Sequence, residues 1–175
     1  MNRKYFFPGK PLLFASFLML AAGSLAAQNV PAKASLIEGD IRAALPGEMA
    51  YKPVKVGDKL PSGTWIRSGA DSRAVFVTVP GAAIRVSENS LFQISLLSVT
   101  PGQENTSRKA RINLKQGTLS ALLNEVDSST IDFRIRTSQG ICAARGTFYG
   151  VTVDGEKTYL SVKEGEVGVS EHKKK

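Results

Sequence analysis

Residues 133–162 read FRIRTSQGICAARGTFYGVTVDGEKTYLSV, and this stretch decides the fold class. Its first five residues alternate apolar side chains with charged or polar ones, which predicts a strand with Phe133 and Ile135 on the inner face. Residues 147–153 repeat the alternation. Asp154-Gly155 then predicts a tight reversal into another apolar run, so the stretch contains a β-hairpin.

Short strands and turns extend outward from this stretch to about Ala34. Pro46-Gly47, Pro80-Gly81 and Pro101-Gly102 match the type II turn, in which proline sets φ and glycine takes a positive φ. Residues 74–79, AVFVTV, are apolar or β-branched on both faces and predict a central strand. Breaks recur roughly every 8–12 residues, which indicates an all-β fold. We expect a rolled or two-layer antiparallel sheet with β-solenoid or jelly-roll character.

Two segments between these strands are less regular. Residues 100–108 are polar and rich in turn formers, which predicts a loop. Residues 114–126 fit either two strands broken at Gly117 or one or two turns of helix built on Leu119, Leu122, Leu123 and Val126. We favour a strand for 115–121 and leave the rest open.

The N-terminal segment has the features of a secretory signal peptide. Residues 3–10 carry basic side chains and no acidic one, an apolar stretch follows over 12–22, and small residues precede Gln28. The apolar stretch is shorter than the ~20 residues that a membrane-spanning helix needs. We therefore expect residues 1–27 to be cleaved and the mature protein to be soluble, in the periplasm or secreted, and not membrane-spanning.

The formal net charge of +8 overstates the charge of the folded part. Three of the 23 basic residues and none of the 15 acidic ones lie in the signal peptide, which leaves +5 for the mature chain. A basic tail, residues 171–175, supplies three of those charges from its lysines and is expected to be solvated. The remaining body, near +2, does not indicate the concentrated basic face that nucleic acids require, so no nucleic-acid partner is expected.

The residue types that catalysis and metal binding need are scarce. His172 is the only histidine, which argues against Ser-His-Asp or Cys-His catalysis and against multi-histidine metal sites. The glycines fall at turns and do not form a phosphate-binding loop. Cys142, the only cysteine, lies in an apolar run and is expected to be buried and unreactive. We therefore expect no enzymatic activity, no cofactor and no metal.

The strongest local motif follows the strand that ends at residue 137. It consists of Arg145, Gly146 and Thr147, then Tyr149 and Val151. This order resembles the hallmark segment of FecR-type periplasmic domains, with tyrosine in place of the family's usual phenylalanine.

The resemblance covers residues 34–170, from opening strands that include Trp65 to a closing run around Gly165. It implies a FecR-like β domain between the signal peptide and the basic tail, acting as a non-catalytic cell-envelope interaction or scaffold module. Family members that regulate sigma factors carry a cytoplasmic helical segment and a membrane helix before this domain. Here a signal peptide is expected instead, so we do not transfer sigma-factor signalling to this chain.

We interpret the hallmark residues and Gly165 as structural, because Gly146 permits a close backbone approach or an unusual φ. The leading partner is another envelope protein, bound through an exposed face or by adding a strand to a sheet edge. One alternative is a glycan- or peptidoglycan-binding module that uses Trp65 and Phe148. Two further alternatives are that the protein forms part of a periplasmic signalling assembly or that it is a structural component of the envelope. The identity of the partner and the oligomeric state stay open.

Overall fold

The computed structural model describes residues 26–124, 126, 129–144 and 148–171. The predicted signal peptide lies outside these residues except at 26–27, and the basic tail lies outside them except at 171. The hallmark residues Arg145, Gly146 and Thr147 also lie outside. Every regular element in the described part is a β-strand, as predicted. In chain order they are β1 Gln28–Asn29, β2 Ala32–Glu38, β3 Ile41–Ala44, β4 Lys52–Pro53, β5 Lys59–Leu60, β6 Trp65–Ser68, β7 Arg73–Val79, β8 Ala82–Val86, β9 Leu91–Thr100, β10 Thr106–Leu123, β11 Ser129–Arg136, β12 Gly140–Ala144, β13 Phe148–Asp154, β14 Lys157–Glu164 and β15 Val167–Glu171.

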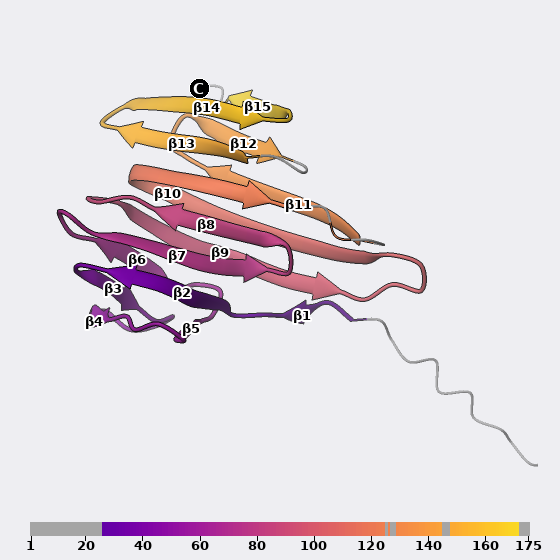
Figure 1. Cartoon of the computed structure of the whole chain (residues 1–175), viewed down its shortest axis with the longest axis horizontal. Helices are drawn as coiled ribbons and strands as arrows, with labels where there is room; N and C mark the ends of the chain where they lie inside the picture. Colours follow the sequence, from indigo (N-terminus) through magenta and orange to yellow (C-terminus); the bar gives the residue numbers. More distant parts are fainter. Residues whose placement is uncertain (1–25, 125, 127–128, 145–147, 172–175) are drawn as a thin grey trace, which may run out of the picture.

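The strands form one strongly curled sheet that folds into two layers. Layer A has the order β4-β3-β6-β9-β10-β11-β12-β15, with β1 beside β9, and layer B has the order β5-β2-β7-β8-β10-β13-β14. Figure 1 shows the strands stacked from β4 and β5 at one end to β14 and β15 at the other. The rolled, two-layer architecture confirms the predicted fold class.

Strand β10 belongs to both layers and joins them. Residues 106–116 pair with β9 and β11 in layer A, whereas residues 117–123 pair with β8 and β13 in layer B. Gly117 lies at the crossing with a φ of +85°. The run that continues past residue 121 is therefore strand as far as Leu123, and the helical alternative is wrong.

One strand pair departs from the predicted antiparallel pattern. Strand β10 ends in layer B, so the chain must return to layer A before β11 begins. Strand β11 then starts beside the start of β10, and the two strands are therefore parallel. The loop predicted for residues 100–108 is also shorter than expected, since β9 continues to Thr100 and β10 begins at Thr106. These polar residues form strand because pairing between β9, β10 and β11 satisfies their backbone groups.

The core fills the space between the layers with the inward side chains of alternating strands. Phe76 of layer B meets Phe92 of layer A edge to face, with ring centroids 6.3 Å apart. Phe133 and Ile135 are fully buried, as the alternation predicted, and Cys142 is buried beside them in the same apolar cluster. The first strands belong to this core as well, because Ala34 of β2 and Ile41 of β3 are buried in it.

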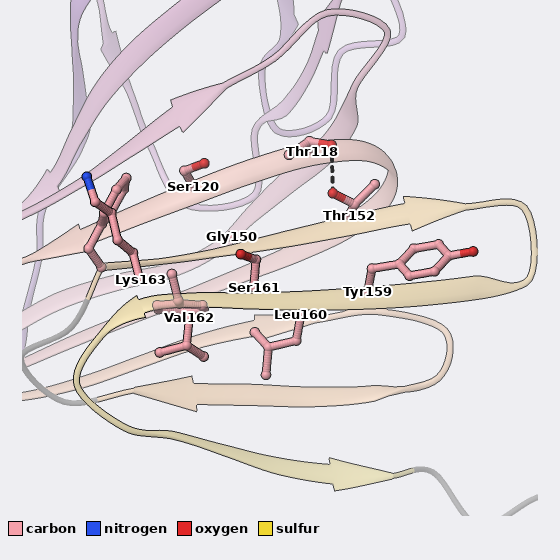
Figure 2. Close-up of a pocket in the computed structure, with 11 residues that line it drawn as sticks. Thr118, Ser120, Gly150, Thr152, Tyr159, Leu160, Ser161, Val162 and Lys163 are labelled. Carbon is pink, nitrogen blue, oxygen red and sulfur yellow. Dashed lines mark hydrogen bonds between the residues drawn. The ribbon is translucent and has the colours of Figure 1, made fainter.

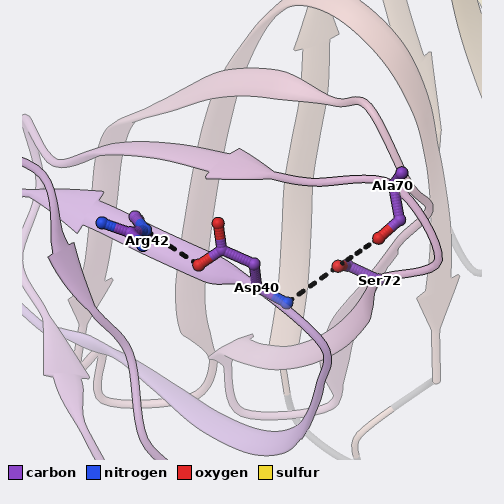
Figure 3. Close-up of polar contacts among 4 residues, drawn as sticks. All are labelled: Asp40, Arg42, Ala70 and Ser72. Atoms are coloured by element: carbon purple, nitrogen blue, oxygen red, sulfur yellow. Dashed lines mark hydrogen bonds and ion pairs between the residues drawn. The ribbon is translucent and has the colours of Figure 1, made fainter.

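A pair of turns is fixed by a serine hydroxyl (Figure 3). Ser72 Oγ accepts a hydrogen bond from the Asp40 backbone N–H and donates one to the Ala70 carbonyl, both at 2.8 Å. Arg42 Nε pairs with the Asp40 carboxylate at 2.8 Å. These contacts tie the β2–β3 turn to the β6–β7 turn, so the polar residues here serve the fold.

Candidate functional site

The two ends of the layered structure differ in how their edge strands are protected. At one end the edges are β4 and β5, each two residues long, and β4 contains Pro53. Short strands and proline are common protections against pairing with another chain. At the other end the edges are β14 with eight residues and β15 with five, and each pairs with only one described strand. These two strands are longer and contain no proline, although β14 carries Lys157 and Lys163.

The inward side chains at the second end are incompletely covered. Val162 lies opposite the buried Tyr149 and therefore faces the core, yet it is 44% exposed. Val169 lies opposite the buried Cys142 and is 59% exposed. We call the surface formed by the inward residues Leu160, Val162, Val167 and Val169 the open end. Among the described residues nothing completes the core there.

The backbone of β14 also offers unused hydrogen-bonding groups. Gly155, with a φ of +57°, begins the two-residue β13–β14 turn, and Asp154 faces Lys157 as the closing pair. Bonded and non-bonded pairs alternate along an antiparallel ladder from such a turn. The N–H and C=O groups of Thr158, Leu160 and Val162 therefore point away from β13, toward the free edge.

A shallow trough of about 530 Å³ crosses the outer face of layer B beside this edge (Figure 2). Its floor is a cross-strand row of small residues, Ser120, Gly150 and Ser161. Phe148, with the Lys163 ammonium 5.3 Å from its ring centroid, lines one side. The other side is lined by Thr118, Thr152 and Tyr159, and the two threonine hydroxyls are hydrogen-bonded at 2.9 Å.

Of the described hallmark residues, Tyr149 borders the trough, but its side chain and that of Val151 belong to the core. Tyr149 and Val151 point inward, and both are buried. Burial raises the pKa of the Tyr149 phenol well above its usual value, and the hydroxyl has no hydrogen-bond partner among the described residues. Gly165, with a φ of +84°, permits the turn between β14 and β15. Tyr149, Val151 and Gly165 thus occupy structural positions, and the structural role of the rest of the motif stays a prediction.

Burial of the Tyr149 phenol should make the folded protein less stable at alkaline pH. Because the pKa of Tyr149 is higher in the folded chain, the unfolded chain releases this proton first and stability falls above about pH 10. Tyr149→Phe should remove this contribution and should leave stability at pH 7 unchanged or higher, since no hydrogen bond is lost. Urea unfolding of the wild type and the variant at pH 7 and pH 11 measures the loss of stability between these two pH values.

The exposed Tyr159 supplies the control for this experiment. Tyr159→Phe should retain the full alkaline loss of stability. Equal losses in the wild type and in Tyr149→Phe would show that the Tyr149 phenol is not the group responsible.

The two aromatic residues of the predicted ligand face lie on different layers. Trp65 is on β6 in layer A, between Ala44 and Gln93, whereas Phe148 is on β13 in layer B. The structure therefore does not bring them into one surface. Each has its own surroundings, and Phe148 belongs to the trough.

A buried arginine was not singled out from the sequence. Arg108 of β10 is 2% exposed and donates a hydrogen bond from its guanidinium to the Pro80 carbonyl, and burial lowers its pKa. The sequence could have indicated this burial, because Arg108 lies two residues before Ala110 and four before Ile112 and therefore shares their strand face. The position of Arg108 beneath the Pro80-Gly81 turn indicates a structural role.

The described residues contain no group of three or more side chains of the kinds that ligate metals. Nor does the described chain include a helix with the length and apolarity needed to cross a membrane.

The model of the FecR protein family matches residues 64–168, which run from just before β6 into β15. No curated protein matches the chain. The matched range includes the trough and, except for Val169, the open end. Strands β2 and β3 lie before it, although they pack into the same core.

Proposed function

Since this chain belongs to the FecR protein family, we propose that it is an exported, non-catalytic interaction module of the cell envelope. Its partner is another envelope protein, which supplies an extended segment that pairs with β14. The N-terminal sequence supports export, because residues 1–27 have the order of a signal peptide.

The open end is the observation that carries this proposal. Val162 and Val169 face the core but are 44% and 59% exposed, on two edge strands that each have one described neighbour. An added strand would cover these apolar side chains and pair with the free backbone groups of β14. Main-chain hydrogen bonds then supply affinity, and the alternate side chains supply specificity.

The neighbours of the added strand define its sequence. Its inward residues would lie beside Leu160 and Val162 and should be apolar. Its outward residues would lie beside Tyr159, Ser161 and Lys163, at the margin of the trough. We infer an extended segment with apolar residues at alternate positions, a bulky residue next to Ser161, and an acidic residue near Lys163.

Site-specific crosslinking in envelope fractions tests the proposal. A photoreactive amino acid at Val162 should capture a distinct protein, joined through an extended segment with alternating apolar residues. The same amino acid at Val77, which is 41% exposed in the middle of layer B, is the matched control and should not capture it.

Two results would contradict the proposal. One is capture of the same protein with equal yield from both positions. The other is a product that contains only a second copy of this chain.

A further inference from the structure

The outer face of layer A carries an unbalanced set of cations on two neighbouring strands, β10 and β11. Because β10 and β11 alternate buried and exposed residues, their charged side chains share the outer face. Five of them are basic and one is acidic, namely Lys109, Arg111, Lys115, Arg134, Arg136 and Asp132. We call these residues, with Trp65, Gln93 and Asn113, the basic face.

These cations have little internal compensation. Asp132 pairs with Arg134 at 2.6 Å, and no salt bridge within the described residues involves the other four. Arg111 lies directly opposite Arg134 in the β10–β11 register. Like charges in this position destabilise a strand pair. The face therefore keeps a local repulsion that an anionic partner would relieve.

A row of side chains with different chemistries crosses the basic face. Strand pairing places Trp65, Gln93, Asn113 and Arg136 side by side on four neighbouring strands. Three steps of about 4.8 Å make the row about 14 Å long. The amides are held in place, since Gln93 donates to the Gly63 carbonyl at 3.1 Å and Asn113 donates to Gln93 at 3.4 Å.

The row ends at a polar hollow of about 310 Å³. Lys115 and Arg136 lie on its two strands, and Asn113, Thr137 and Ser138 also line it. Two cations with amide and hydroxyl groups between them suit a carboxylate or sulfate group. At the other end of the row, the Trp65 ring offers an apolar surface of the kind on which sugar rings stack.

The basic face offers little to a lipid bilayer beyond its charge. The strongly exposed large apolar side chains of the described chain lie at turns, on layer B or at the open end, and none lies on this face. Peripheral binding to a bilayer typically combines charge with buried apolar groups. One tryptophan at the end of an amide row also differs from the successive aromatic platforms that single-stranded nucleic acids use.

We propose that the basic face of layer A binds an acidic polysaccharide. Carboxylate or sulfate groups pair with Arg111, Lys115 and Arg136, hydroxyl groups bond the amide row, and a sugar ring packs on Trp65. This site goes beyond the proposed protein-binding function, because it lies on the outer face of the other layer and uses none of the residues of the open end.

Binding of the full chain to polygalacturonate tests the proposal, with dextran as the uncharged comparison. Trp65 is the only tryptophan, so its fluorescence should change on binding. Binding should weaken as salt is raised. The double variant Arg111→Gln/Arg136→Gln should bind about tenfold more weakly, since it loses two charged contacts.

The matched control removes the same charge from layer B. Lys33→Gln/Arg85→Gln should bind within about twofold of the wild type, because surface charges this far from the ligand are screened. The Arg111 and Arg136 variant should melt no lower than the wild type, because the repulsion between Arg111 and Arg134 is removed. Reduced binding with undiminished stability separates a ligand-binding role from a structural one.

Several outcomes would overturn the proposal. They are equal binding to dextran, an equal loss of affinity in the two double variants, and unchanged Trp65 fluorescence in the bound state. Tighter binding to single-stranded DNA or to vesicles of anionic phospholipid would assign the face to another class of partner.

Discussion

Replacing Gly117 with alanine is expected to lower the free energy of unfolding by about 3 kcal/mol. Gly117 has a φ of +85°, which alone costs an alanine about 1–2 kcal/mol. A Cβ atom here would also overlap the Ser90 hydroxyl and lie 2.5 Å from the Ser90 Cα. Ser90 Oγ accepts the Thr118 N–H at 3.0 Å and donates to the Ser87 carbonyl at 2.9 Å, so Ser90 cannot move freely.

Gly155→Ala is the matched control for this variant. Gly155 also has a positive φ, of +57°, but no atom lies within 4 Å of the position of an added Cβ. Its cost should be the conformational one alone, about 1 kcal/mol. Urea unfolding monitored by circular dichroism compares the two. Equal costs would show that the crossing of β10 between layers does not depend on the contact between Gly117 and Ser90.

Replacing Val162 with lysine is expected to weaken binding of the crosslinked envelope protein by about a hundredfold. The side chain faces the core at the open end, so an added strand would bury the new ammonium group without a partner. In the free protein the lysine stays solvated, since Val162 is 44% exposed, and folding should be little affected. Inward-pointing charges at sheet edges prevent pairing in this way.

Val77→Lys makes the same substitution at a position of similar exposure, 41%, on the outer face of layer B. It should leave affinity within about twofold, because no strand is added there. Affinity measured by titration of the purified partner separates the two variants. Unchanged affinity in Val162→Lys would place the binding surface elsewhere on the molecule.

The sequence predicts the local parts of this fold well because each depends on neighbouring residues. Alternation at 133–137 placed Phe133 and Ile135 in the core, and the Asp154-Gly155 turn joins β13 to β14. The crossing of β10 could not be read in this way. The alternation in β10 changes phase near Gly117, because the buried positions are even-numbered up to Leu114 and odd-numbered from Leu119. This change marks a break in the strand, but the choice of layer for each half depends on the distant contact between Gly117 and Ser90.

The candidate surfaces were harder to predict because they depend on which residues share a face. The net charge of the folded part, near +2, gave no sign of the basic face, because a net charge sums over all faces of the molecule. In the structure many acidic residues lie at turns, including Asp58, Glu88 and Glu156, whereas β10 and β11 hold five cations on one side. The exposure of Val162 and Val169 likewise follows from strand order, which the sequence left open.

Amide hydrogen exchange along β14 in the free protein tests the central claim, that this strand is an unpaired edge available to a partner. The amides of Thr158, Leu160 and Val162 should exchange rapidly, and those of Tyr159 and Ser161 should be protected by β13. This alternation should disappear when the envelope partner is bound. Uniform protection of all five amides in the free protein would contradict the claim, because it would mean that the edge is already covered.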